Sequence, residues 1–179
     1  MNRRHVLAAA SGAAVPVLLL AMRRPVFAQD TTTASGMTLD AAQHKTRTLQ
    51  IGSLSLQTSQ LALQRAKNAR VREFAGFERD EQLTIAQVLT DMQAPQPMTL
   101  DQTNAGILQT LSSISGSQFD EIYVADQIQA HTQLLQVQQA FLQSQSSMGT
   151  DNVHVAMLAR TVIQMHLTML SDLRSVLQG

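Results

Sequence analysis

Residues 117–142 read SQFDEIYVADQIQAHTQLLQVQQAFL and decide the fold of this chain. Apolar side chains recur every three or four residues along the stretch, which is the spacing of one face of an α-helix. This face comprises Phe119, Tyr123, Ala130, Leu134, Val137 and Phe141, with His131 among them. The stretch therefore predicts one long helix whose wide apolar face must be covered by several partner helices.

Similar spacing elsewhere predicts the partners of this helix. Long helices are expected over residues 39–66, 69–92 and 151–177, and a short amphipathic helix over residues 100–114. Thr38 and Asn68 are expected to cap the first two long helices, because their side-chain oxygens can accept hydrogen bonds from free backbone N–H groups. The inner face of the last helix is expected to comprise Val155, Leu158, Val162, Met165, His166, Met169, Leu173 and Val176.

The lengths of the connections predict how the helices are joined. The first and second long helices, and the third and fourth, are separated by a few residues, so each pair should form an antiparallel hairpin. The longer linker between the hairpins carries the short helix, introduced by Thr99-x-x-Gln102, and Ser117-x-x-Asp120 should open the third long helix. This pattern predicts an all-α, ferritin-like four-helix bundle. A simple up-and-down bundle, capped by the short helix, is the alternative.

The N-terminus reads as a targeting segment. Arg3 and Arg4 precede an apolar run over residues 6–22, and the moderate and small residues Val26 and Ala28, at positions −3 and −1, fit cleavage after Ala28. The paired arginines favour twin-arginine export over the general secretion route, and an uncleaved anchor is the alternative. We therefore expect a periplasmic or secreted protein. Its expected parts are an export signal over residues 1–28, a flexible leader over residues 29–37 and the bundle domain over residues 38–179.

Composition excludes several classes of function. Four of the thirteen basic residues lie in residues 1–28, so the remainder has nine basic against thirteen acidic residues and is a poor nucleic-acid binder. The chain has no cysteine, which excludes disulfides and thiolate chemistry. No nucleophile with a neighbouring base and no glycine-rich phosphate loop is visible in the sequence. The sequence therefore favours a non-catalytic protein.

Five residues are candidate metal ligands: Glu78, Glu81, Asp126, His131 and His166. Both histidines are expected on inward faces of facing helices, and imidazole together with carboxylate binds transition metals. A di-iron centre in a ferritin-like bundle needs Glu-x-x-His on two helices, but Ile128 and Ile163 stand three residues before these histidines. The sequence therefore argues against a di-iron oxidase and leaves a single iron or copper ion as an alternative.

The simpler expectation for these histidines involves no cofactor. Buried polar groups normally find hydrogen-bond partners, and Gln82, Glu81 and Tyr123 are candidate partners for the two rings. Methionines near His154 and His166 offer soft ligands for copper, although methionine at helical spacing usually fills gaps in a core. These methionines are Met157, Met165 and Met169.

Several stretches resemble one known family. They are Leu61-Ala62-Leu63 with Ala66, Asn68 with Val71 and Phe74-Ala75, Phe119-Asp120 with Tyr123, Gln127 and His131, and His166-Leu167. In these residues the chain resembles a bacterial exported family of ferritin-like bundles known as domain of unknown function 4142. That family commonly has a histidine where this chain has Gln82, and carboxylates where it has Ser55 and Gln57. The resemblance implies an exported helical bundle and no established activity.

Three functions remain open from the sequence. The first is a non-catalytic structural or partner-binding bundle, with a protein partner or a second copy of itself, in the context of envelope stress. The second is a metal-binding bundle that uses the inward histidines. The third is association with the envelope or a membrane surface through the short helix, which lacks the basic face that such helices usually carry.

Overall fold

The computed structural model describes residues 38–144 and 150–179, and these residues form five helices. The helices are α1 (Ala41–Arg65), α2 (Ala69–Thr90), α3 (Gln102–Ser113), α4 (Gly116–Ser144) and α5 (Asp151–Gln178). The export signal expected over residues 1–28 and the leader expected over residues 29–37 lie outside the described residues. Both therefore stay predictions.

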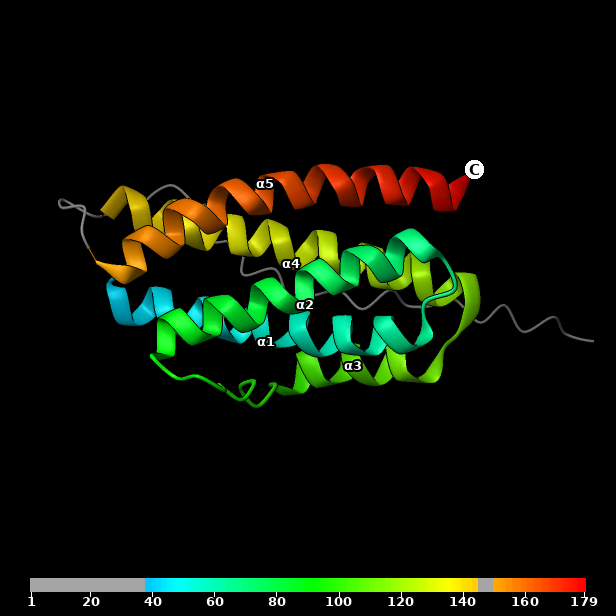
Figure 1. The fold of residues 1–179 in the computed structure, drawn as a ribbon, viewed down its shortest axis with the longest axis horizontal. Helices are drawn as coiled ribbons and strands as arrows, with labels where there is room; N and C mark the ends of the chain where they lie inside the picture. Colours follow the sequence, from blue (N-terminus) through cyan, green and yellow to red (C-terminus); the bar gives the residue numbers. More distant parts are fainter. Residues whose placement is uncertain (1–37, 145–149) are drawn as a thin grey trace, which may run out of the picture. The chain divides into compact units, whose positions relative to one another are not determined.

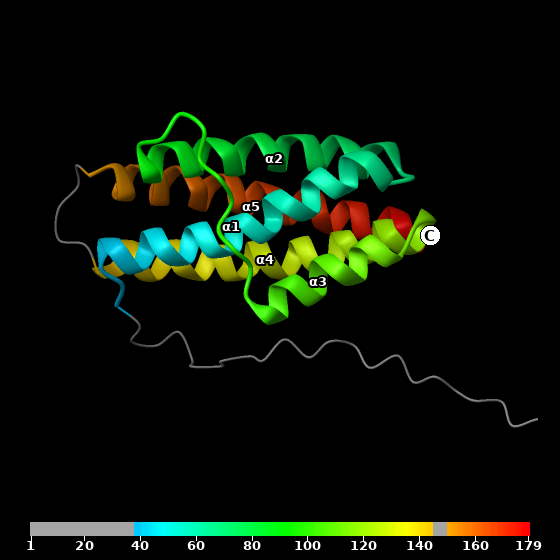
Figure 2. The same cartoon turned by 90° about the horizontal axis from the view of Figure 1, so that it is seen from below.

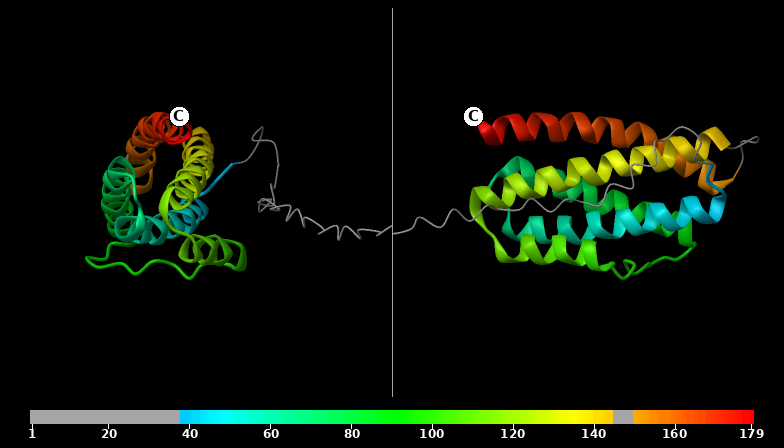
Figure 3. Two further views of the ribbon diagram at one scale, coloured as in Figure 1. Left: turned by 90° about the vertical axis from the view of Figure 1, so that its right-hand side faces the viewer. Right: turned by 180° about the vertical axis from the view of Figure 1, so that it is seen from behind.

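Four helices surround a common axis in the order α1, α2, α5, α4 (Figure 3, left). Each packs against its two neighbours in this ring, while α3 lies outside it against α1 and α4 (Figure 1). The hairpin of α1 and α2 and the hairpin of α4 and α5 each consist of antiparallel helices. The structure thus confirms the all-α bundle of two antiparallel hairpins.

The connection between the hairpins runs the length of the bundle. α2 ends at one end of the bundle and α4 begins at the other, and the chain between them crosses α1 before it enters α3 (Figures 1 and 2). As a result α2 and α4 lie across the ring from each other instead of side by side. The short helix in a long connection is confirmed, and the simple up-and-down path is wrong.

Two helices begin at aspartates that were not predicted to be N-caps. The Asp40 carboxylate accepts a hydrogen bond from Gln43 N at 2.8 Å, and Asp40 N donates to Gln43 Oε1 at 3.1 Å, so these residues form the capping box of α1. Asp101 caps α3 through its side chain. The caps expected at Thr38 and in Thr99-x-x-Gln102 are wrong, because aspartate is a stronger N-cap than threonine.

The turn between α1 and α2 is fixed by a side chain from α4. Asn68 caps α2 as expected, since its side-chain oxygen accepts a hydrogen bond from Arg70 N at 2.9 Å. Buried Asp120 accepts hydrogen bonds from Lys67 N at 3.0 Å and Asn68 N at 2.7 Å. Asp120 therefore ties the first hairpin to α4 and does not form the expected capping box with Ser117.

The buried face of α5 differs from the expected one. Leu158, Met165 and Val176 are exposed by 70%, 53% and 51%. The buried side chains of α5 are Val153, Val155, Ala156, Ala159, Ile163, His166, Leu170 and Leu173. Both faces repeat apolar residues every three or four positions, so spacing alone does not separate them. The alanines of the buried face allow neighbouring helices to approach more closely than the larger residues of the expected face would.

Candidate metal centre

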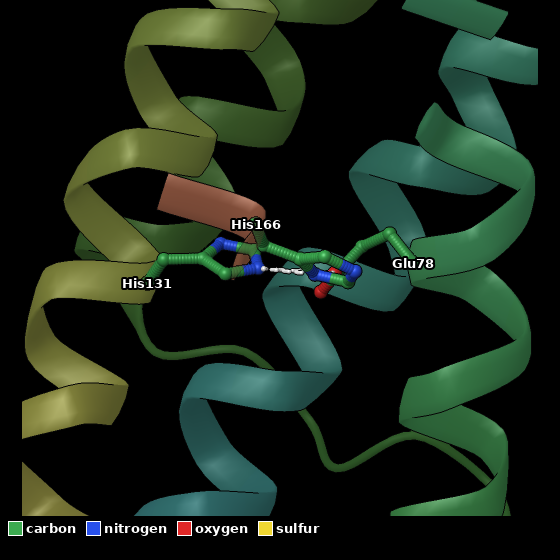
Figure 4. Close-up of side chains that lie close together, drawn as sticks. All are labelled: Glu78, His131 and His166. Carbon is green, nitrogen blue, oxygen red and sulfur yellow. Dashed lines mark hydrogen bonds and ion pairs between the residues drawn. The ribbon is translucent and has the colours of Figure 1, made fainter. Parts of the chain in front are cut away.

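Three buried side chains from three helices meet inside the bundle. Glu78 from α2, His131 from α4 and His166 from α5 point toward one another (Figure 4). His131 Nε2 is 3.1 Å from both Glu78 Oε2 and His166 Nδ1, and His166 Nδ1 is 3.2 Å from Glu78 Oε2. None of the three residues is more than 3% exposed. Three donor atoms thus form a nearly equilateral triangle that is closed to bulk water.

A backbone hydrogen bond orients the ring of His131. Its Nδ1 lies 2.8 Å from the carbonyl oxygen of Gln127, one turn earlier on α4, and a carbonyl can only accept. Nδ1 therefore carries a proton and donates it to Gln127, so a neutral His131 presents the lone pair of Nε2 to the triangle. Metal-binding histidines are commonly held in this way, with one nitrogen on a backbone carbonyl and the other on the ion.

The two oxygens of Glu78 have different surroundings. Oε1 accepts hydrogen bonds from Ser55 Oγ at 2.5 Å and from Gln82 Nε2 at 3.0 Å. Oε2 faces the two histidines. One oxygen therefore fixes the carboxylate while the other is directed into the triangle, as expected for a ligand that binds through one oxygen.

Further buried residues hold this arrangement in place. Ser55 Oγ also lies 2.7 Å from Gln127 Oε1, and Gln127 Nε2 donates to Thr58 Oγ1 at 2.9 Å. A hydroxyl donates one hydrogen, and we assign that of Ser55 to Glu78 because a carboxylate is the stronger acceptor. On α1, Gly52 leaves room for Gln82, since a Cβ at Gly52 would overlap Gln82 Oε1.

Burial and neighbouring charge set the ionisation of the triangle. Burial disfavours the charged form of Glu78, but His131 and the hydrogen bonds from both histidines and Ser55 hold its pKa well below the usual range. Burial also acts to lower the pKa of His131, but the charge and hydrogen bond of Glu78 outweigh it and raise this pKa. Without an ion, an anionic Glu78 therefore faces a cationic His131. A divalent ion would take the place of the proton on Nε2.

Glu81 lies at the edge of the triangle. Its Oε2 is 3.3 Å from His166 Nδ1, and its side chain is 17% exposed, more than any of the other three. Oε2 itself is buried and accepts no hydrogen bond. Burial, and then the charge of Glu78, raise the pKa of Glu81 to about 7. Of the five candidate ligands, the structure therefore brings three together and places Glu81 beside them.

Asp126 does not join the group. It lies five residues before His131 on α4, is partly buried, and has a pKa that burial raises to about 7. The copper site built from methionines is not assembled around His166 either. Met165 is 53% exposed and His154 is exposed, so both side chains face outward.

α1 has a polar face inside the bundle that was not predicted from the sequence. Its most deeply buried members at helical spacing are His44, Thr48, Gly52, Ser55, Ser59 and Ala62. Nε2 of His44 donates to Gln138 Oε1 at 2.6 Å, and Tyr123 Oη lies 2.8 Å from Ser59 Oγ instead of reaching the two central histidines. The signal was present in the sequence as small and polar residues three or four positions apart.

The triangle has the size of a metal coordination sphere. Zinc binds imidazole nitrogen and carboxylate oxygen at about 2.0–2.1 Å, so tetrahedral ligands lie roughly 3.3–3.4 Å apart. The observed separations of 3.1, 3.1 and 3.2 Å are close to this value. An ion at this place would be held by Glu78 Oε2, His131 Nε2 and His166 Nδ1. The residues therefore fit one ion with three protein ligands and an open fourth position.

Comparison with known proteins places the chain in a family. Neither a curated protein nor a solved structure shows significant similarity to it. One family model, described as a domain of unknown function (DUF4142), matches residues 26–173. This match spans most of the sequence, and the chain belongs to that family.

Proposed function

We propose that this bundle binds one divalent transition-metal ion between Glu78, His131 and His166. The observation that carries the proposal is the triangle of Glu78 Oε2, His131 Nε2 and His166 Nδ1, with sides of 3.1, 3.1 and 3.2 Å. Because Nδ1 of His131 is already bonded to a carbonyl, its Nε2 is available as a ligand. The carboxylate brings negative charge, which attracts a divalent cation.

The donor set indicates which ions would bind. Two imidazole nitrogens and one carboxylate oxygen suit zinc, iron and copper, and are poorer ligands for magnesium or calcium, which prefer all-oxygen sites. Among first-row divalent ions, copper would bind most tightly at equal concentration. The role that we propose is binding of the ion by a non-catalytic bundle, since the three ligands by themselves specify no reaction.

A structural or partner-binding bundle without metal is the competing function. In that case the triangle would be a buried ion pair between Glu78 and His131, with His166 as a third hydrogen-bonding group. Membrane association is a weaker candidate. Among the described residues only α5 is long and apolar enough to cross a membrane, but it carries His166 into the core.

Metal titration separates the first two functions. Metal-free protein is titrated with zinc, copper(II), cobalt(II) and, without oxygen, iron(II), and bound metal is measured after gel filtration. We expect one ion per chain in the wild type and none in the double variant His131→Ala, His166→Ala. His154→Ala is the matched control, because His154 is exposed on α5. A wild type that retains no metal, or a double variant that still retains one ion, would refute the proposal.

We also propose that the protein acts outside the cytoplasm, after removal of residues 1–28. The support is the sequence of that segment, with Arg3 and Arg4 before an apolar run. Replacing both arginines by lysine should leave the precursor in the cytoplasm if export uses the twin-arginine route. Fractionation of cells and mass spectrometry of the N-terminus would measure this, and an uncleaved protein in the cytoplasm of wild-type cells would refute it.

A further inference from the structure

A hollow of about 380 Å³ opens between α2 and α5. These helices are neighbours in the ring but are the least closely packed of its four pairs (Figure 3, left). Aliphatic side chains from both helices line the hollow, among them Ile85, Val88, Leu158 and Val162. Small-molecule sites in proteins are typically of this kind, with about 300–1,000 Å³ of mostly apolar space and a few polar groups at one side.

The hollow meets the proposed metal centre at Glu81. This residue lines the hollow, and its Oε2 is 3.3 Å from His166 Nδ1. The three proposed ligands are almost completely buried, and Glu81, whose own Oε2 is buried too, lies between His166 and the hollow. Ala159, which also lines the hollow, lies two helical turns before His166 on α5. An ion held by three protein ligands has its fourth position open to an outside donor.

We propose that the hollow between α2 and α5 holds the aliphatic body of a small carboxylic acid, whose carboxylate displaces that of Glu81 from beside His166 and takes the fourth position of the metal. This inference rests on the proposed metal site and adds to it a class of ligand. The apolar lining explains the aliphatic body, since burying methylene groups there removes them from water. The cation explains the anionic head. Of the other polar residues in the lining, Asp80 is already paired with Arg79 at 2.8 Å, which offsets its charge.

Cobalt(II) is the probe for this inference, because its d–d absorption changes when a ligand is exchanged. Protein loaded with cobalt(II) is titrated at constant ionic strength with acetate, butyrate and hexanoate. We expect each acid to shift the absorption, and the dissociation constant to fall about fourfold for every methylene group that enters the hollow. Equal dissociation constants for acetate and hexanoate, or an unchanged spectrum, would overturn the inference.

A matched pair of variants tests the location of the acid. Thr84→Phe fills the hollow, because Thr84 is an exposed residue in its lining. Thr110→Phe is the control, since Thr110 is exposed on α3 and, like Thr84, donates its hydroxyl to the carbonyl four residues earlier at 2.8 Å. Thr84→Phe should weaken hexanoate binding at least tenfold and change acetate binding little, whereas Thr110→Phe should match the wild type.

The outcomes distinguish this inference from the proposed function. Cobalt binding with no effect of chain length, or equal hexanoate affinity in both variants, refutes the carboxylic-acid site and leaves the metal site standing. A wild type that takes up no cobalt refutes both. Retention of cobalt in Thr84→Phe shows that this variant is folded, so that its weaker hexanoate binding supports the hollow as the site.

Discussion

Replacing Glu78 by glutamine separates metal binding from the stability of the fold, because the two side chains have nearly the same shape. Oε1 of Glu78 accepts hydrogen bonds from Ser55 at 2.5 Å and from Gln82 at 3.0 Å, and Oε2 is 3.1 Å from His131 Nε2. In Glu78→Gln the amide oxygen can keep both accepted hydrogen bonds. The new NH₂ group can donate to Nε2 of a neutral His131, so every polar atom keeps a partner.

These contacts set the expected magnitudes. Replacing a buried ion pair by well-packed hydrophobic residues of similar volume is often neutral or stabilising by about 1–4 kcal/mol, whereas leaving one buried charge without its partner costs about 3–5 kcal/mol. Glu78→Gln is closer to the first case, because His131 loses its proton together with the anion and no buried charge is left unpaired. We therefore expect the free energy of unfolding of the metal-free protein to change by less than about 1.5 kcal/mol.

Metal affinity should respond much more strongly. Losing an outer hydrogen-bond partner of a ligand typically costs about 10–100-fold in affinity, and loss of the charged ligand itself should cost more than this. Urea unfolding of metal-free protein gives the first quantity, and competition with a chromophoric chelator gives the second. Glu73→Gln is the matched control, since Glu73 is exposed on α2. A metal-free Glu78→Gln that loses 3 kcal/mol or more (about the cost of an unpaired buried charge), or that binds zinc as tightly as the wild type, would refute the reasoning.

Three further substitutions test separate parts of the structure. Ser55→Ala removes a hydrogen-bond donor from Glu78, so chelator competition should show an affinity about 10–100-fold lower. Asp120→Ala removes two hydrogen bonds from the turn between α1 and α2, and urea unfolding should show a loss of about 2–4 kcal/mol with metal affinity unchanged. Asp126→Asn should change the pH dependence of stability. Burial raises the pKa of Asp126 from 3.8 to about 7, so the wild type should lose stability as pH rises through this range. Allowing for partial exposure, the variant should be more stable at pH 8 by about 1–2 kcal/mol, and no more stable at pH 4.

Each of these predictions has a result that contradicts it. Unchanged metal affinity in Ser55→Ala would show that the hydroxyl does not support the ligand. Wild-type stability of Asp120→Ala would mean that the two backbone N–H groups find other partners. Parallel pH curves for wild type and Asp126→Asn would show that Asp126 titrates in the folded protein as it does in the unfolded chain.

The sequence was most informative where two signals agreed. Helical spacing and a strong capping residue coincided at Asn68, and the start of α2 was predicted correctly. The length of the linker between the hairpins correctly predicted a long connection, because a linker that contains a helix of its own can run from one end of the bundle to the other. Capping failed at Thr38, where Asp40 two residues on is the better acceptor for the free N–H groups.

The face of a helix was harder to predict than the helix itself. On α5, Leu158 and Met165 follow the same spacing as the buried Ala159 and His166, and only the fit between neighbouring helices decides which face is covered. On α1 the buried face contains Ser55 and Ser59, which scales of hydrophobicity assign to the surface. These serines are buried because Glu78 and Tyr123 supply hydrogen-bond partners from other helices, and spacing within one helix carries no information on such partners.

The sequence predicted which residues could form the candidate site, but it did not predict how they are arranged. Glu78, His131 and His166 were predicted as ligands from their residue type and from the helix face on which they were expected. The same reasoning also predicted Asp126, which is not part of the group that the structure brings together. The two histidines are separated by 35 positions in the chain. Whether they meet depends on the relative rotation of α4 and α5, which follows from packing along the whole of both helices.

The most direct test of the metal site is X-ray absorption at the zinc edge, on protein loaded with one equivalent of zinc. We expect a first shell of nitrogen and oxygen at about 2.0–2.1 Å and the outer-shell scattering of two imidazole rings. In Glu78→Gln bound zinc should be lost, or its first shell should change, with no effect from Glu73→Gln. A first shell of water and carboxylate oxygens without imidazole scattering would contradict the proposed metal site, because it would place the ion away from His131 and His166.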